Sequence, residues 1–305
     1  MKKIKRRKRP GTKYKPVDPY WSCNTGQLYH ANCIQVLHQF KNKANLIVTS
    51  PPYDKLRSYF DKEDKKRKKD HKYEFDFEGV ANAIKYSLKK GGVLVWVVGD
   101  QTKDGTESGN SFRQALHFLD IGLNLHDTMI YRKITPLPMR APRYTQEFDF
   151  MFVFSKGKVK TWNPIMKPTK FFDKNKVWDY ATRKSAAAFE GGAMTSGTAR
   201  FEAKKMKVIG NIWSYAAGGH IATRDRIAAA QPATFPEKLP RDHIISWTNP
   251  GDLVIDPMSG SGTTCKMAHK LGRKWVAIEK VRKYCINIKK RMYNLTTQNQ
   301  LFEEN

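Results

Sequence analysis

Residues 253–264 read LVIDPMSGSGTT, a short apolar run that leads into a turn with two glycines. The run has the length and the branched aliphatic residues of a buried strand, and it ends at Asp256. Gly260 and Gly262 allow the backbone to adopt positive φ and leave room for a ligand beside the main chain. From Thr263 onwards the residues have the pattern of a helix. The stretch therefore predicts a strand, a tight turn and a helix in succession.

A second acidic residue stands at the end of the next apolar run. The segment KWVAIEK, 274–280, reads as a strand that ends at Glu279. An acid roughly 20 residues beyond a glycine-rich turn commonly accepts hydrogen bonds from ribose hydroxyls. The turn is neither GxGxxG nor GxxxxGK[ST], which argues against a dinucleotide site and against an ATPase phosphate loop. The pattern indicates a nucleoside-containing cofactor at the carboxyl end of a parallel sheet; the alternative is a turn that only connects two elements.

Strand-like and helix-like segments alternate along the rest of the chain. The run VLVWVV, 93–98, is continuously apolar, as in a strand buried on both faces of a parallel sheet. The alternation predicts an α/β fold with a doubly wound, mostly parallel sheet and one β-hairpin. The expected strands are 46–50, 91–100, 126–133, 147–157, 252–257 and 274–280, and the expected helices are 80–90, 111–122, 239–248 and 263–272.

Composition shifts divide the chain into regions. Residues 1–19 are rich in lysine and arginine and are expected to form a basic disordered arm. The sheet domain is expected to comprise 20–157 and 231–292, with 293–305 as a C-terminal tail. Residues 158–230 lack clear periodicity, so they read as an insertion, either a recognition element or a long irregular excursion.

The charge of the chain is strongly positive. Lysine and arginine outnumber aspartate and glutamate 56 to 28, which gives a formal net charge of +28. Such a field favours a polyanionic partner, with nucleic acid first and an anionic membrane surface second, although solubility alone would also account for it. No stretch approaches the roughly 18 apolar residues that span a membrane. The four cysteines show no CxxC pair and no zinc spacing, so we expect no metal and a reducing cytoplasm.

Residues 49–53 read TSPPY and end the predicted strand 46–50 in two consecutive prolines. Prolines lack an N–H group and have a fixed φ, so they present their carbonyl groups in a rigid arrangement. On its own the segment also fits a turn that only terminates a strand, with Tyr53 as an ordinary half-buried aromatic residue.

Several stretches together resemble the beta class of S-adenosylmethionine-dependent DNA amino-methyltransferases. TSPPY is similar to that family's catalytic motif (D/N/S)PP(Y/F), and LVIDPMSGSGTT is similar to its cofactor loop. The helix expected at 239–248 and the stretch GRKWVAIEKVRKYCINIKKRM also resemble the family. The catalytic motif comes first and the cofactor loop last, which is the permuted order of the beta class. The resemblance implies a Rossmann-like catalytic domain with an inserted target-recognition region at 158–230.

The resemblance also implies roles for individual residues. Ser50 Oγ and the Pro51 carbonyl would accept the hydrogens of a base amino group, Pro52 would keep the motif rigid, and Tyr53 would stack on a flipped-out base. The residues that would hold S-adenosylmethionine are Asn32, Asp256, Pro257, Gly260, Ser261, Gly262, Thr263, Thr264 and Glu279.

One position departs from the family pattern. The segment LYHANCIQVL, 28–37, has Asn32 where related proteins usually carry an aspartate near the adenine ring. An amide oxygen can still accept a hydrogen bond from an adenine amino group, without a charge. Met258 also replaces a more usual phenylalanine, which is a tolerable packing change.

The form SPPY is typical of enzymes that act on the 4-amino group of cytosine, so double-stranded DNA with cytosine N4 as target is the favoured substrate. Adenine N6 remains an alternative, as do an RNA amino-methyltransferase and a non-catalytic basic DNA-binding protein. A bacterial or phage-infected cytoplasm is the expected location. The sequence leaves open a homodimer and a cognate restriction nuclease on a separate chain.

Overall fold

The computed structural model describes residues 14–52, 75–136, 142–170, 177–183, 196–202, 204–216, 225, 227 and 236–303. The chain forms two compact units. The larger unit comprises Met1–Asn163 and Asn211–Asn305, and the smaller unit comprises Pro164–Gly210.

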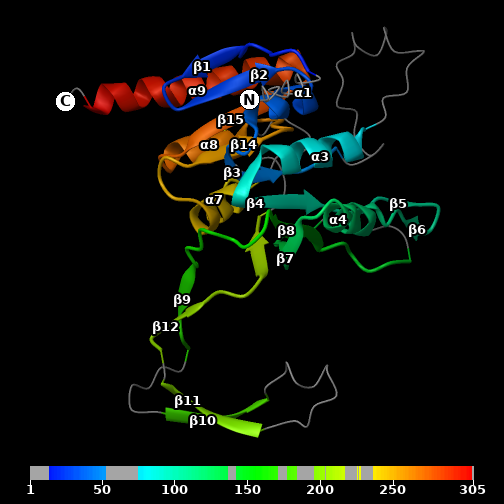
Figure 1. Ribbon diagram of the computed structural model, residues 1–305, viewed down its shortest axis with the longest axis vertical. Helices are drawn as coiled ribbons and strands as arrows, with labels where there is room; N and C mark the ends of the chain where they lie inside the picture. The colour runs from blue at the N-terminus through cyan, green and yellow to red at the C-terminus, as the bar shows by residue number, and fades with distance from the viewer. Residues whose placement is uncertain are drawn as a thin grey trace, which may run out of the picture. The chain divides into compact units, whose positions relative to one another are not determined.

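The larger unit is built on one sheet, which has nine strands among the described residues (Figure 1). Their order is β1-β2-β15-β14-β3-β4-β8-β7-β13. The strands are β1 Trp21–Cys23, β2 Gly26–His30, β3 Ala44–Thr49, β4 Leu88–Val98, β7 Asn124–Lys133, β8 Phe148–Ser155, β13 Ile212–Tyr215, β14 Leu253–Asp256 and β15 Lys274–Glu279. Every neighbouring pair from β2 to β4 is parallel, and β7 and β8 form the predicted antiparallel hairpin. The predicted mostly parallel α/β sheet is therefore confirmed.

Helices cover both faces of this sheet. They are α1 Cys33–Leu37, α3 Phe77–Ser87, α4 Asn110–Asp120, α7 Lys238–Trp247, α8 Thr263–Lys270 and α9 Arg282–Glu303, with a short 3-10 helix η1 at His38–Phe40. Phe152 and Phe154 of β8 join a core cluster with residues of α1, α3 and α4. Met151, directly before Phe152, points to the opposite face, where its Sδ contacts His243 of α7 at 3.4 Å. The sheet is doubly wound, as predicted.

The central strand β4 shows why this sequence forms a buried parallel sheet. Every side chain from Val93 to Val98 is buried, since the strand is paired on both edges, with β3 and β8, and covered on both faces. A continuous apolar run is the expected sequence for such a strand.

The connections that follow β3 and β14 run in opposite directions along the sheet. From β3 the chain passes through α3 to β4 on one side, whereas from β14 it passes through α8 to β15 on the other side (Figure 1). Neighbouring parallel strands whose connections diverge form a topological switch point, and ligands of α/β proteins bind outside the carboxyl ends of the strands there. The ends of β3 and β14 are therefore the expected ligand site.

Several predicted boundaries were wrong. The helix expected at 80–90 ends at Ser87, because Leu88 is already buried and paired with Ala44 of β3. Strand β13, Ile212–Tyr215, falls inside the insertion expected at 158–230 but pairs in parallel with β7 in the main sheet. Its alternating burial is regular, but four residues are too few to give a clear period in the sequence.

The two predicted ends of the chain also differ from the structure. Residues 1–13 of the expected disordered arm lie outside the described residues, but the arm does not extend to residue 19. The Tyr14 ring packs against His38 in a tilted arrangement, with 4.5 Å between the ring centroids, and Val17 packs against the core. The boundary expected between 292 and 293 falls inside α9, which continues to Glu303.

The described residues of the smaller unit form two antiparallel ribbons. Strand β9, Met166–Pro168, pairs with β12, Met206–Val208, and places Lys167 opposite Lys207. Strand β10, Val177–Arg183, pairs with β11, Ser196–Glu202. A further small hairpin, β5 Thr102–Lys103 with β6 Thr106–Glu107, belongs to the larger unit. Within the described ranges, no helix has both the length and the apolar character required to cross a membrane.

Candidate active site

The catalytic motif and the cofactor loop predicted from the sequence meet at the switch point. Thr49, the last residue of β3, donates from Oγ1 to Asp256 Oδ1 of β14 at 2.8 Å. The two residues are 207 positions apart in the chain, and both are buried. Ser50 follows Thr49 directly, so this bond brings the SPP segment next to the start of the glycine loop.

Asp256 lies at the base of the loop. Its Oδ1 also accepts a hydrogen bond from the backbone N–H of Met258 at 3.1 Å. Burial raises the pKa of this carboxyl group to about 6, although the hydrogen bonds from Thr49, Met258 and Thr264 oppose the rise. A carboxylate of this kind, at the end of a buried strand, can accept hydrogen bonds from an amine or a hydroxyl group.

Ser259 fixes the loop to the neighbouring strand. Its backbone N–H donates to the Ile278 carbonyl at 3.0 Å, and its Oγ accepts from the Ile278 N–H at 3.1 Å. The same hydroxyl donates to the Asp256 carbonyl at 2.8 Å. One serine therefore joins the ends of β14 and β15, a role that the sequence analysis missed because serine is common in turns.

The two glycines of the turn are required for different reasons. Gly260 has φ of 51° and its N–H donates to Glu279 Oε2 at 2.9 Å. Gly262 has φ of 77° and is the N-cap of α8. A Cβ atom at Gly262 would also lie 3.0 Å from Ile288 of α9, closer than normal packing. The turn therefore needs both the positive φ and the missing side chain.

Glu279, the last residue of β15, accepts hydrogen bonds from backbone N–H groups of the glycine loop and of the residues that follow the strand. Oε2 accepts from Gly260, and Oε1 accepts from the Val281 N–H at 2.8 Å. Burial raises the pKa of this carboxyl group to about 7, and the negative charge of Asp256 adds to the rise. Each carboxylate oxygen has two lone pairs, so Glu279 retains capacity for ribose hydroxyls.

Asn32 has a structural task that the sequence analysis did not predict. Its Oδ1 accepts from the Ile34 N–H at 2.9 Å and so caps the first turn of α1. The residue is exposed, and the neighbouring Ala31 N–H donates to the Glu279 carbonyl at 3.2 Å. Asn32 is therefore close to the glycine loop along the sheet edge, but its amide oxygen already has one donor.

The remaining predicted residues divide into three groups. Pro51 is buried, and Ser50 and Pro52 are half-buried at the end of β3. Tyr53 lies outside the described residues. In the loop, Pro257, Ser261, Thr263 and Thr264 are all buried, and Ser261 Oγ lies 2.9 Å from Thr263 Oγ1.

Residues 44–290 match a family of DNA methylases. The orphan methyltransferase M.BamHII of Bacillus amyloliquefaciens is 43% identical over 253 residues, which cover 82% of this chain and 89% of that protein. The type II methyltransferase M.PvuII of Proteus hauseri is 26% identical over 293 residues, which cover 87% of this chain and 83% of that protein.

Two solved structures share the fold. The PvuII DNA methyltransferase, described as cytosine-N4-specific, matches with a TM-score of 0.62 and 20% identity, over 89% of this chain and 88% of that chain. M1.HpyAVI in complex with S-adenosylmethionine matches with a TM-score of 0.53 and 20% identity, over 87% of this chain and 98% of that chain. The family match and the 43% identity to M.BamHII show that this chain belongs to the N6/N4 DNA methylases.

Proposed function

We propose that this protein transfers a methyl group from S-adenosylmethionine to the exocyclic amino group of a base flipped out of double-stranded DNA, with cytosine N4 as the favoured target. The observation that carries the proposal is the hydrogen bond from Thr49 to Asp256, because it joins the SPP segment to the glycine loop. A methyl donor and a methyl acceptor must lie side by side, and these two segments are adjacent at one sheet edge.

The glycine loop and its acidic neighbours suit the proposed cofactor. Glu279 would accept hydrogen bonds from the ribose hydroxyls, and Asn32 would lie near the adenine. The main chain at Gly260 and Gly262 permits close approach, and α8 begins directly after the loop. The M1.HpyAVI structure, which has this fold, was solved with S-adenosylmethionine.

Positioning is the main task of the SPP segment in this proposal. S-adenosylmethionine supplies an electrophilic methyl group. Ser50 Oγ and the Pro51 carbonyl would accept hydrogen bonds from the amino group of the base. These bonds would turn the nitrogen lone pair away from conjugation with the ring. The rigid diproline holds these acceptors in place, and correct orientation of the reactants accounts for much of the rate. Tyr53 would stack on the flipped base.

The choice of cytosine rests on the form SPPY. Both cytosine and adenine present an amino group beside a ring nitrogen, so the geometry at Ser50 suits either one. The likeness to the cytosine-N4-specific PvuII enzyme concerns the fold alone at 20% identity. Adenine N6 is therefore the alternative that the experiment must distinguish.

The smaller unit supports a polyanionic substrate. In the ribbon of β9 and β12, Lys167 and Lys207 are directly opposite and both exposed. Like charges in such a pair destabilise a ribbon, and phosphate groups would remove the repulsion. Lys170, Lys204 and Lys205 are exposed at the ends of the same ribbon. We propose that residues 158–230, in which this ribbon lies, contact DNA.

Nucleoside mass spectrometry tests the function. The purified chain is incubated with unmethylated genomic DNA and S-adenosylmethionine carrying a deuterated methyl group, alongside Ser50→Ala and the exposed β1 variant Ser22→Ala as a matched control. The expected product is labelled 4-methylcytosine from the wild type and Ser22→Ala, and little from Ser50→Ala. Labelled 6-methyladenine would overturn the choice of base. Absence of both, with the cofactor bound, would favour the RNA or non-catalytic alternative.

A further inference from the structure

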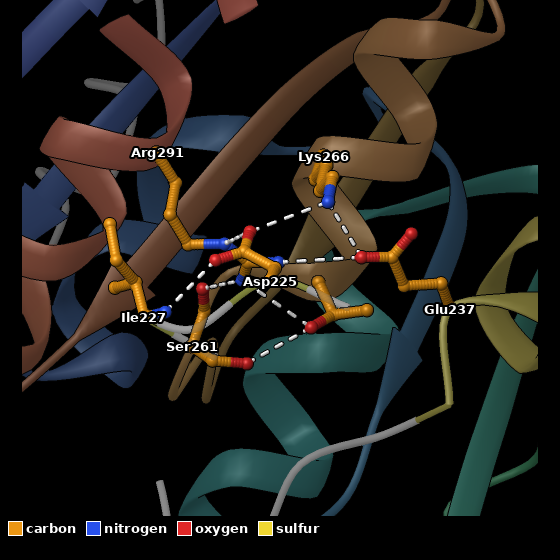
Figure 2. A network of polar contacts seen from close by, with 7 residues as sticks. Asp225, Ile227, Glu237, Ser261, Lys266 and Arg291 are labelled. Carbon is orange, nitrogen blue, oxygen red and sulfur yellow. Dashed lines mark hydrogen bonds and ion pairs between the residues drawn. The ribbon is translucent and has the colours of Figure 1, made fainter. Parts of the chain in front are cut away.

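A cluster of four charged residues lies behind the glycine loop (Figure 2). Asp225 Oδ2 lies 2.7 Å from Arg291 Nε and 3.4 Å from Lys266 Nζ. Glu237 Oε1 lies 2.6 Å from Lys266 Nζ and 3.8 Å from Arg291 Nη2. Lys266 belongs to α8 and Arg291 to α9, whereas both acids precede α7. The four charges cancel, and the cluster joins three segments that are far apart in the chain.

Arg291 connects this cluster to the loop itself. Its Nη1 donates a hydrogen bond to the carbonyl of Ser261, the residue between the two glycines, and lies 3.5 Å from Thr263 Oγ1. The Arg291 side chain is only 2% exposed, so this contact is shielded from water. A glycine-rich turn has many accessible backbone conformations, and a fixed one must be imposed by its neighbours. Arg291 fixes the Ser261 carbonyl, while Glu279 fixes the Gly260 N–H.

Asp225 supplies the negative charge that stabilises the buried Arg291 side chain. A buried guanidinium group without a counter-charge is strongly unfavourable. The problem is greater here because Lys266 adds a second, 12% exposed cation, and because α8 begins at this point with the positive end of its dipole. Asp225 also accepts from the Ile227 N–H at 3.0 Å, which holds its carboxylate in place. The setting of Arg291 therefore depends on the segment that leads into α7.

We propose that Arg291 is a positioning residue for the cofactor loop, and that Asp225 orients its guanidinium group so that cofactor affinity depends on both. The inference rests on the proposed function, because the cofactor in question is S-adenosylmethionine. A purely structural role, in which Arg291 only attaches α9 to the domain, predicts a loss of stability without a change in cofactor affinity.

The test compares Arg291→Met, Arg291→Lys and Asp225→Asn with Arg273→Met in the full chain. Arg273 is a matched control because it is also buried and donates to backbone carbonyls, those of Thr248 and Leu271, away from the loop. The dissociation constant of S-adenosylmethionine is measured by calorimetry and corrected for the folded fraction, together with KM for DNA.

We expect Arg291→Met to weaken cofactor binding by about tenfold or more, and Arg291→Lys by less, since lysine keeps the charge without the planar fork. Asp225→Asn should weaken binding several-fold alone and add nothing in the Arg291→Met background. KM for DNA should stay within about twofold, and Arg273→Met should lower Tm with cofactor affinity unchanged.

A folded Arg291→Met protein with wild-type cofactor affinity would overturn the inference. If that variant does not fold, unchanged affinity in both Arg291→Lys and Asp225→Asn would overturn it instead. A wild-type chain that does not bind S-adenosylmethionine would overturn the proposed function and this inference together, so the two failures are distinguishable.

Discussion

The Thr49 hydroxyl group donates to the Asp256 carboxylate at 2.8 Å, across the boundary between β3 and β14. This bond lies at the point where the connections of the sheet diverge, and it joins two segments that the sequence separates by 207 positions. Both residues are buried, so loss of this bond would leave a polar group without water to replace its partner and would lower the stability of the fold.

Thr49→Val keeps the shape of the side chain and removes the donor. Asp256 would then keep its buried position with fewer hydrogen bonds, so we expect a loss of about 1–3 kcal/mol in the free energy of unfolding. Since the Thr49 bond lowers the pKa of Asp256, that pKa should rise further in the variant. Denaturant unfolding measures the loss of stability, and an NMR titration of the Asp256 carboxyl group measures the change in its pKa. Thr49→Ser, which retains the hydroxyl group, should behave like the wild type; equal losses in the two variants would contradict the role of the bond.

Cofactor affinity should rise with pH around neutrality. Burial raises the pKa of Glu279 to about 7 in the free protein, and a ribose hydroxyl donates best to the ionised carboxylate. The dissociation constant of S-adenosylmethionine should therefore fall between pH 6 and pH 8. The midpoint of this change should lie within about one unit of pH 7. Glu279→Gln should bind more weakly and lose this dependence. A wild-type affinity that is flat across the range would be inconsistent with the role given to Glu279.

The raised pKa values of Asp256 and Glu279 should make the free energy of unfolding fall as the pH rises, whereas cofactor affinity should increase. The pKa of Asp256 is raised from 3.8 to about 6, and that of Glu279 from 4.5 to about 7. The folded chain thus binds these protons more tightly than the unfolded chain does, and the associated stability is present below pH 4 and lost as the pH rises through 6 and 7. Asp256→Asn should therefore gain stability relative to the wild type as the pH increases, by up to about 3 kcal/mol. Unfolding free energies measured between pH 3 and pH 8 would show it, and a constant difference would contradict it.

Gly262→Ala should be more damaging than Gly272→Ala. Both glycines have positive φ, of 77° and 71°, so both variants incur backbone strain of about 1 kcal/mol. Only at Gly262 would the new Cβ also meet Ile288 at 3.0 Å, whereas nothing lies within 4 Å at Gly272. Thermal unfolding should separate the two variants, and cofactor binding should be weakened in Gly262→Ala alone. Equal losses would show that packing against α9 is unimportant.

Lys167→Ala combined with Lys207→Ala should weaken DNA binding without changing cofactor affinity. If each lysine neutralises one phosphate, the slope of log K against log salt should become shallower by about 2. Lys289→Ala with Lys290→Ala on α9 is the control, since those lysines are also exposed. Binding curves at several salt concentrations test this, and an unchanged slope would exclude the ribbon from phosphate contact.

Local sequence patterns are sufficient to predict the class of fold and the position of the glycine loop. Continuous apolar runs such as VLVWVV are typical of strands buried on both faces by covering helices, so the doubly wound architecture follows from local patterns. The glycine turn of 260–262 and the acids at 256 and 279 are also local signals, because each lies at or soon after the end of a predicted strand. The hairpin of β7 and β8 was recognisable for the same reason.

The residues that hold the loop and the SPP segment in place depend on tertiary contacts. Thr49, Ser259 and Arg291 act through partners that are distant in the chain or across a strand boundary, and nothing in their local sequence distinguishes them from other threonines, serines and arginines. Asn32 shows the converse, because its side chain is used by the helix cap next to it. Hydrophobic periodicity reports which face of an element is buried. It contains no information about which polar groups meet there, since that depends on the register and packing of elements brought together by folding.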